Sequence, residues 1–345
     1  MNTPRTPRDF LKVFLYSIIL LSLALLPVSS VARGAGLSPQ TTPTIGACPV
    51  FPADNVWNTA VDKLPVAPHS AETISAIGAS THLHPDFGSA YWDGGPIGIP
   101  FNVVDSNTPK YNIDFWWPDE SDAGPYPIPA NPLVEYGSDH HLLLVDQSAC
   151  KLYELYAVTA PAAGHGWQAG SGAIYDLNSN ALRTSTWTSA DAAGLAMVPG
   201  LARYAEVAAG HIDHALRFTV SRTKAGFIWP ARHDAATGSG TYTPVNGMRF
   251  RLKSTFDSSA FKPQAQVILT ALKKYGMIVA DNGSSWYISG EPNAGWDEDD
   301  IGGLKSIAGS NFELVDESSL QVSADSGQAY VPNLIPRAWF PFLVK

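Results

Sequence analysis

Short segments of strand-forming residues divide most of the chain, and this pattern restricts the fold more than any other feature. About ten segments rich in Val, Ile, Tyr, Phe or Trp are bounded by Gly, Pro, Asp or Asn. They cover residues 97–104, 112–117, 141–145, 152–158, 173–177, 215–220, 248–252, 277–280, 286–289 and 312–315. So many short strands predict a mainly β fold, with a single β-sandwich or jelly-roll-like domain, rather than a doubly wound sheet.

Few segments have the pattern of a helix. Residues 263–275 form the clearest one, because Pro263 suits the first helical position, an apolar stripe follows and Gly276 ends it. Shorter helices are expected at residues 71–77, 190–197 and 304–308. Charged residues make up only 15% of the chain, which also holds 29 Gly and 27 Pro, and this composition favours β structure.

The first 32 residues are typical of a secretory signal peptide. Arg5, Arg8 and Lys12 precede an apolar stretch over residues 13–28, and small residues follow at 30–32. An uncleaved membrane anchor is the alternative, although the stretch is shorter than the ~20 residues that usually span a bilayer. We therefore expect a secreted or periplasmic protein that has left the membrane once the signal is cleaved.

The rest of the chain divides into a short linker and one domain. Residues 33–47 are rich in Ser, Thr, Pro and Gly, which indicates a linker, and residues 48–345 are expected to form a single β-rich domain. The chain has two cysteines, Cys48 and Cys150. An oxidising compartment favours one disulfide between them, and a pair of separate buried thiols is the alternative.

The chain is acidic, and its charge restricts the partners. The formal net charge is −9, and removal of residues 1–32 takes away three basic residues and one acidic residue, which leaves −11. An acidic surface repels phosphate backbones and anionic lipid, so we expect neither a nucleic-acid partner nor membrane binding after cleavage. The charge does not exclude neutral ligands, and we expect an oligosaccharide or polysaccharide as the partner. We expect the protein to be a monomer.

A β-hairpin over residues 139–156 carries the first candidate site. Along its second strand Glu154 and Tyr156 share one face, and Asp139 and His141 begin the first strand. A carboxyl group desolvated by aromatic rings has a raised pKa and can donate a proton to a sugar that stacks on those rings. The alternative is a glutamate on the sheet surface that pairs with a nearby cation.

An acidic loop follows the aromatic pair Trp116 and Trp117. Asp119, Glu120 and Asp122 lie in this loop. Glycoside hydrolysis requires two carboxyl groups, one as the acid and one as the base or nucleophile. The same oxygen atoms suit Ca²⁺, and a solvated acidic turn is a further alternative. We expect no cofactor, with Ca²⁺ at this loop as the exception.

Histidines provide a different candidate chemistry. His214 begins an apolar strand face, where a histidine is more often part of the core than a catalyst. His82 and His84 point the same way in an extended segment and could share a metal with a distant carboxylate, although this spacing is common by chance. We expect no metal site.

Several long segments carry a resemblance to other proteins. They are HPDFG (84–88), DESDAGPYPIP (119–129), CKLYELY (150–156), AGSGAIYDLNSNALR (169–183), TSADAAGL (188–195), IDHALRF (212–218) and ALKKYGMIVADNGSSWYISG (271–290). On these segments the chain resembles a group of uncharacterised secreted bacterial proteins. The resemblance implies one secreted domain that spans all of them, and it implies no activity.

Together these observations favour a secreted glycoside hydrolase that acts on a polysaccharide. Glu154 would be the acid, and Asp119, Glu120 or Asp122 would be the base or nucleophile. The expected sugar-stacking rings are those of Trp116, Trp117, Tyr126, Tyr156 and Trp167. One alternative is a carbohydrate-binding or cell-surface protein without catalysis. The other is a polysaccharide lyase or metal-dependent enzyme that uses His141 and His214.

Overall fold

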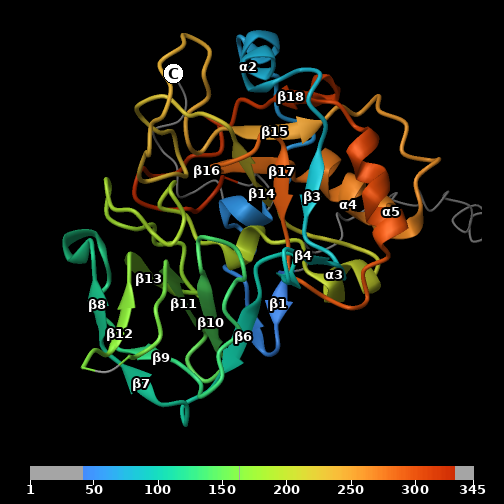
Figure 1. Cartoon of the computed structure of the whole chain (residues 1–345). Coiled ribbons are helices and arrows are strands. Elements are labelled where there is room, and N and C mark those ends of the chain that lie inside the picture. Colours follow the sequence, from blue (N-terminus) through green and yellow to red (C-terminus); the bar gives the residue numbers. More distant parts are fainter. Residues whose placement is uncertain (1–41, 163, 331–345) are drawn as a thin grey trace, which may run out of the picture. The chain divides into compact units, whose positions relative to one another are not determined.

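Two sheets dominate the computed structural model, which describes residues 42–162 and 164–330 (Figure 1). The larger sheet has six strands. Their order is β18 (Phe312–Leu314), β15 (Arg249–Leu252), β16 (Met277–Asn282), β14 (Leu216–Val220), β17 (Tyr287–Ser289) and β3 (His84–Asp86). The predicted signal peptide, the linker up to residue 41 and the last fifteen residues of the predicted domain, 331–345, lie outside the described residues.

The second sheet has four strands and contains the predicted hairpin. Its order is β13 (Ser171–Asp176), β11 (Lys151–Tyr156), β10 (Leu142–Asp146) and β6 (Phe101–Val104). The register of β10 against β11 pairs Leu143 with Glu154. Small two-stranded sheets join β1 (Thr44–Ile45) to β2 (Cys48–Pro49), β4 (Tyr91–Trp92) to β5 (Gly95–Pro96), β7 (Lys110–Tyr111) to β9 (Tyr126–Pro127), and β8 (Ile113–Phe115) to β12 (Trp167–Ala169).

The mainly β class is confirmed, and each of the ten predicted segments contains a strand. The expected sandwich or jelly-roll topology is not confirmed. The strand pairs β10–β6, β14–β16, β17–β3 and β12–β8 are all parallel, whereas a jelly roll is built from antiparallel strands. The two main sheets are therefore mixed sheets.

The helices are short. They are α2 (Ser70–Ile77), α3 (Tyr204–Ala208), α4 (Pro263–Lys274) and α5 (Glu298–Gly302), with 3₁₀ turns η1 (Val56–Asn58), η2 (Pro118–Glu120), η3 (Val198–Gly200), η4 (Gly303–Ser306) and η5 (Gly309–Asn311). The predictions of α2 and α4 are confirmed. Gly276 follows the end of α4 and has a positive φ of 69°. A Cβ at this position would lie 2.3 Å from the carbonyl oxygen of Phe250. The helix expected at 304–308 is a 3₁₀ turn one residue earlier.

The helix expected at residues 190–197 is wrong. Side chains bind the backbone of this segment in a different conformation. The Ser189 hydroxyl donates to the carbonyl oxygens of Asp191 and Leu195, and the Asp191 carboxylate accepts from the amide of Ala193. Such local bonds compete with helical ones. Gly194 also has a positive φ of 68°, which a helix does not allow.

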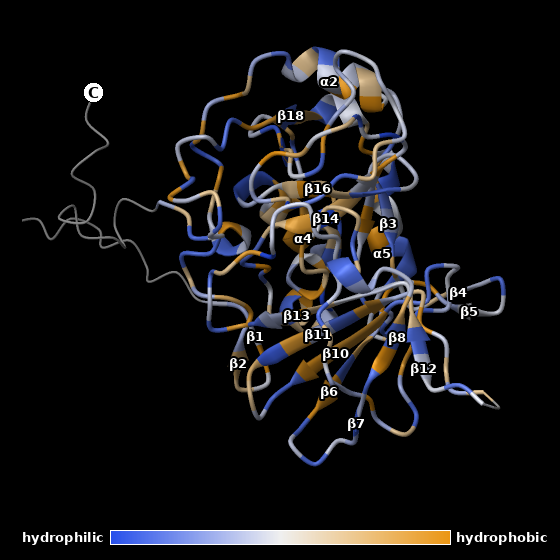
Figure 2. Cartoon of the chain, turned by 90° about the vertical axis from the view of Figure 1, so that its left-hand side faces the viewer, coloured by the Kyte–Doolittle hydropathy of each residue, from blue (hydrophilic) through white to orange (hydrophobic). Residues whose placement is uncertain are grey.

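The hairpin β10–β11 has apolar neighbours on both faces, which explains its continuous apolar sequence. Leu143 and Val145 belong to the core that includes α4 and the six-stranded sheet, while Leu142 and Leu144 belong to a second core. Figure 2 shows hydrophobic residues along β10 and β11. A strand that is buried on both faces does not need the alternation of polar and apolar residues that marks a surface strand.

The predicted disulfide between Cys48 and Cys150 is confirmed, with a Cα–Cα distance of 5.2 Å. It joins β2 to the turn between β10 and β11. This single bond closes a loop of about a hundred residues, because the two cysteines are 102 positions apart. In the part of the chain that the structure describes, no helix is long and apolar enough to span a membrane.

Candidate functional site

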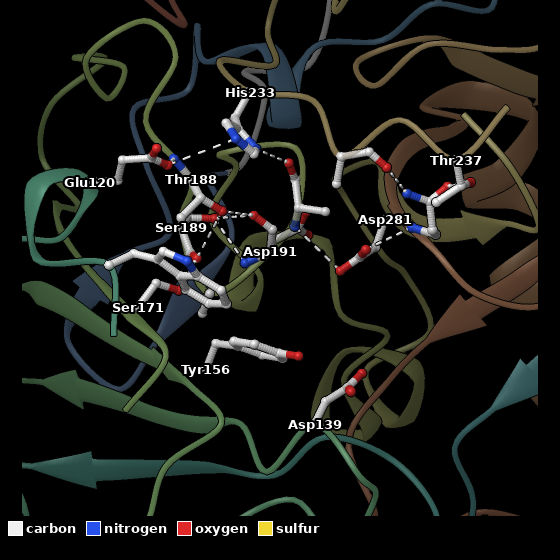
Figure 3. Close-up of a pocket in the computed structure, with 15 residues that line it drawn as sticks. Glu120, Asp139, Tyr156, Ser171, Thr188, Ser189, Asp191, His233, Thr237 and Asp281 are labelled. Atoms are coloured by element: carbon white, nitrogen blue, oxygen red, sulfur yellow. Dashed lines mark hydrogen bonds and ion pairs between the residues drawn. The ribbon is translucent and has the colours of Figure 1, made fainter. Parts of the chain in front are cut away.

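A cavity of about 470 Å³, here called the main cavity, opens between the two large sheets (Figure 3). One wall comes from the η2 turn and the end of β11, which contribute Trp117, Glu120 and Tyr156. The segment 188–192, the loop 233–237 and the end of β16 complete it. The main cavity thus collects side chains from segments that are far apart in the sequence.

Two aromatic rings form one side of the main cavity. The rings of Trp117 and Tyr156 lie 6.3 Å apart at an angle of 18°, and Trp117 is 48% exposed. Gly170 supports both rings, since a Cβ at this position would lie 2.7 Å from Cδ1 of Tyr156 and 3.0 Å from Cζ3 of Trp117. The backbone therefore fixes these rings from beneath and leaves part of their surface open to a ligand.

Asp281, at the end of β16, is a carboxyl group of altered acidity in the main cavity. It accepts hydrogen bonds from the amides of Asn282 (2.7 Å) and Ala192 (3.3 Å). Burial raises the pKa of Asp281 to about 7, and the negative charge of Asp191 adds to the effect, which the positive charge of Arg217 opposes. At neutral pH Asp281 is therefore protonated in a large part of the molecules.

Asp191 and Arg217 form a buried ion pair next to Asp281. One carboxylate oxygen of Asp191 accepts from Nε and Nη2 of Arg217, at 3.1 and 3.0 Å. The third guanidinium nitrogen donates to the hydroxyl of Ser289 at 2.7 Å. Both charged groups are buried, so each depends on the other for its stability.

Glu120 and His233 occupy the side of the main cavity opposite Asp281 (Figure 3). Nδ1 of His233 donates to the carbonyl oxygen of Ala192 at 2.9 Å, because a carbonyl can only accept. Nε2 is thereby turned toward Glu120, whose Oε2 lies 3.8 Å away. Glu120 also accepts from the amide of Thr188 at 3.2 Å, which holds the carboxylate at this wall.

A third acidic side chain, Asp139, is exposed and lies at the rim of the main cavity below Asp281 (Figure 3). Its charge reaches the hydroxyl of Tyr156, because burial first, and then the charges of Asp139 and Asp281, raise the pKa of Tyr156. The phenol of Tyr156 therefore stays protonated and offers a hydrogen-bond donor near both carboxyl groups.

His141 does not line the main cavity, and both nitrogens of its ring have partners within the protein. Its Nδ1 lies 2.5 Å from Oε2 of Glu135, and its Nε2 donates to the carbonyl oxygen of Ala190 at 2.9 Å. Burial opposes the charge on His141, but the neighbouring carboxylate of Glu135 raises its pKa overall. Both ring nitrogens are thus occupied, and the pair joins β10 to the segment that carries Asp191.

Glu154, the predicted acid, is fully buried and does not line the main cavity. Its carboxylate accepts from the amides of Met197 (2.9 and 3.0 Å) and Val198 (3.0 Å), which begin the η3 turn. Burial raises the pKa of Glu154 to about 7, as expected for a desolvated carboxyl group. The predicted shift in acidity is present, but the group holds a loop and has no contact with solvent.

The predicted acidic loop separates into different roles. Asp119 is exposed and outside the main cavity, whereas Asp122 pairs with Arg183 at 2.5 Å and accepts from the amide of Ile174 at 2.9 Å. Of the three predicted carboxylates only Glu120 reaches the main cavity. The role of Tyr126 as a sugar-stacking ring is wrong, because Tyr126 is fully buried and donates to the carbonyl of Asp122.

The remaining predicted residues lie away from the main cavity. Trp116 is 59% exposed and packs edge-on against Trp117, with ring centres 5.9 Å apart. Trp167 packs against Tyr111, 6.3 Å away. His214 is fully buried, where its ring nitrogens contact the carbonyl of Ala215 and the carboxylate of Glu206, so its predicted catalytic role is not supported.

Two acids of the main cavity, Asp281 and Asp191, have little signal in the sequence. Asp281 directly follows the predicted strand 277–280, and Asp191 lies in the predicted helix 190–197. A strand continued by two polar residues, Asp281 and Asn282, is the only local signal of a site at this sheet edge. This pattern points to a site only when the residues on the opposite side of the main cavity are known.

Among residues 42–162 and 164–330, no group of three or more His, Cys, Asp or Glu side chains is arranged to hold a metal ion. In the predicted Ca²⁺ loop, Asp122 is already engaged by Arg183. Comparison with protein-family models, with curated proteins and with solved structures found no match for the chain.

Proposed function

We propose that this chain is a secreted glycoside hydrolase that cleaves a polysaccharide of neutral sugars in the main cavity. The observation that carries the proposal is the position of Asp281, a carboxyl group with a pKa of about 7, in a cavity with two supported aromatic rings. An acid that keeps its proton near neutral pH can donate it to the leaving oxygen of a glycosidic bond.

Glu120 is the second carboxyl group of the proposed reaction. It lies on the opposite side of the main cavity from Asp281 (Figure 3), and the amide of Thr188 holds it there. Two carboxyl groups on either side of the scissile bond are what hydrolysis requires. Glu120 acts as the base or nucleophile, and His233, when protonated, stabilises its negative charge.

The side chains around these acids favour a neutral sugar. The rings of Trp117 and Tyr156 provide flat apolar surfaces on which the faces of a sugar ring can stack, and the hydroxyl of Tyr156 can donate to a sugar oxygen. Among the described residues that line the main cavity none is Lys or Arg. A uronic-acid polymer would therefore meet several carboxylates and no matching cation, which disfavours it.

The test is release of reducing ends by purified protein that starts at residue 33. The substrates are soluble neutral polysaccharides, for example hydroxyethyl cellulose, laminarin, glucomannan and glycol chitin. We expect Asp281→Asn and Glu120→Gln each to lower turnover at least about a hundredfold. The matched control is Asp119→Asn, which changes an exposed acid of the same loop and should leave turnover unchanged. Full activity of Asp281→Asn would refute the assignment of the acid.

The alternative of a binding protein without catalysis uses the same rings. Trp116 extends the aromatic surface of Trp117 into solvent, and this surface needs no acid to retain a sugar. Retention of the protein on one of these polysaccharides without release of reducing ends would favour this alternative. Replacement of Trp117 by Ala should then abolish retention, while Asp281→Asn should not.

The alternative of a lyase depends on a histidine that can accept a proton. His141 and His214 are occupied by internal partners, whereas His233 lines the main cavity. Its Nε2 faces Glu120 and could accept a proton in the neutral ring. An increase in ultraviolet absorbance from unsaturated products would favour elimination and would redirect mutagenesis to His233.

A further inference from the structure

A second cavity of about 450 Å³ lies beside the six-stranded sheet, apart from the proposed catalytic residues. The edge strand β3 and its neighbour β17 provide His84 and Tyr287, whose ring centres lie 4.1 Å apart in a stacked arrangement. The hairpin β4–β5 and the segment 135–137 form the opposite wall. None of these residues takes part in the proposed hydrolysis.

The second cavity contains exposed aromatic rings that the backbone holds in place. Tyr136 lies directly on Gly95, where a Cβ would come within 1.9 Å of its Cγ, and its hydroxyl donates to the carbonyl of Asp93 at 2.8 Å. Its side chain is nevertheless 50% exposed, and that of Trp92 is 76% exposed. Gly95 thus supports Tyr136 as Gly170 supports the rings of the main cavity.

One short segment borders both cavities. Glu135, Tyr136 and Gly137 line the second cavity, and Asp139 lines the main cavity. The Cα atoms of Glu135 and Asp139 are at most about 14 Å apart, because four residues of extended chain reach no further. The positive charge of Arg217 influences the pKa of Glu135 on one side and that of Asp281 on the other. The two cavities are therefore neighbours.

We propose that the second cavity is a saccharide-binding site that holds a further part of the same polysaccharide chain, beyond the sugars bound in the main cavity. This inference rests on the proposed function, because it takes the ligand of the main cavity to be a polysaccharide. Trp92 and Tyr136 bind sugar faces, and the substrate is a polymer or long oligomer. Lys305 and the two acids Asp86 and Glu135 supply polar groups for sugar hydroxyls.

The test compares variants of two neighbouring exposed aromatic residues. Trp92 lines the second cavity, whereas Tyr91, which precedes it in β4 and is 72% exposed, does not. Affinity electrophoresis in gels that contain hydroxyethyl cellulose, laminarin, glucomannan or glycol chitin measures binding without turnover. We expect Trp92→Ala and Tyr136→Ala to weaken retention about tenfold, as loss of one stacked ring does, and Tyr91→Ala to bind as the wild type.

Chain length provides the second measurement. For the retained polysaccharide, kcat/KM is measured on its oligomers of two and six sugars. We expect Trp92→Ala to lower kcat/KM about tenfold for the six-sugar oligomer and to leave the two-sugar value unchanged. Tyr136→Phe should behave as the wild type, because it keeps the ring. Equal effects on both lengths, or none, would overturn the inference.

The outcomes separate this inference from the proposed function. Retention that depends on Trp92, in a protein that releases no reducing ends, would support the second site and refute the hydrolase. Hydrolysis that is unaffected by Trp92→Ala at both chain lengths would refute the second site alone. A protein that none of the four polysaccharides retains would count against the second site.

Discussion

Arg217 donates two hydrogen bonds to a single carboxylate oxygen of Asp191, from Nε at 3.1 Å and from Nη2 at 3.0 Å. This pair keeps Asp191 close to Asp281 in a buried position, where the negative charge of Asp191 contributes to the raised pKa of Asp281. The acidity of the proposed catalytic acid therefore depends on the charge of a second carboxyl group, which Arg217 holds in place.

The stability of the protein should depend on pH through Asp281. Its pKa is about 7 in the folded chain, above the ordinary value of 3.8. Between these values the folded state binds more protons than the unfolded state, so the stability contributed by this group falls as the pH rises from about 4 to about 7. Asp281→Asn removes the titrating group, so the stability of the variant relative to the wild type should rise with pH across this range.

The full shift would correspond to about 4 kcal/mol, and solvent access to the carboxyl group reduces that figure. Urea unfolding at pH 4, 5, 6, 7 and 8 measures the difference between variant and wild type. A difference that stays constant over the whole range would contradict the raised pKa.

Turnover should fall on the alkaline side near pH 7. As the pH rises through the pKa of Asp281, the proton that the proposed acid donates is lost, and the rate declines with it. A profile of kcat/KM from pH 4 to pH 9 on the retained polysaccharide measures this limb. Activity that persists unchanged to pH 9 would exclude Asp281 as the acid.

Glu154→Gln should reduce stability and leave turnover within about a factor of three. The carboxylate accepts from the amides of Met197 and Val198, and an amide side chain cannot accept with both of its heavy atoms. We expect a loss of about 1–3 kcal/mol in the free energy of unfolding. Complete loss of activity in a variant of native stability would restore Glu154 as a catalytic residue.

Gly170→Ala should weaken carbohydrate binding by displacing two rings. The new Cβ would lie 2.7 Å from Tyr156 and 3.0 Å from Trp117, so at least one ring must move. The matched control is Gly166→Ala, since a Cβ there meets no atom within 4 Å. In affinity electrophoresis, the dissociation constant for the polysaccharide should be about tenfold higher for Gly170→Ala than for Gly166→Ala. Equal retention of both would argue against binding on these rings.

Removal of the disulfide should destabilise the fold without affecting the site directly. Replacing both Cys48 and Cys150 by Ser frees a loop whose ends are 102 positions apart. The expected loss is about 2–5 kcal/mol in the free energy of unfolding. Thermal unfolding with and without reductant checks this, because reductant should lower the Tm of the wild type and have no effect on the double variant.

The strands could be predicted because their apolar pattern is local in the sequence. The disulfide could be predicted because two cysteines can pair in only one way. The apolar segments of β10 and β11 show where the chain is extended, and two cysteines in an oxidising compartment have one possible pairing. The topology could not be predicted in the same way. Whether two strands pair in parallel depends on the connection between them, and the β14–β16 pair is joined through more than fifty intervening residues.

The candidate site was predicted only in part. The aromatic and acidic pattern selected Trp117, Glu120 and Tyr156, which do line the main cavity. Alternation along β11 placed Glu154 on the same face as Tyr156, but it could not reveal that the segment around Met197 covers this part of the strand. Asp281 escaped detection because its raised pKa comes from burial and from Asp191, ninety positions earlier in the chain.

The charge of Arg217 acts on acids at both cavities. Its charge affects the pKa of Asp86 and of Glu135 at the second cavity, and also that of Asp281 at the main cavity. Loss of this one positive charge would therefore raise the pKa of acids at both cavities together. Proton binding and ligand binding are linked reciprocally, so a ligand that alters proton uptake at Asp281 must have its own affinity altered by pH.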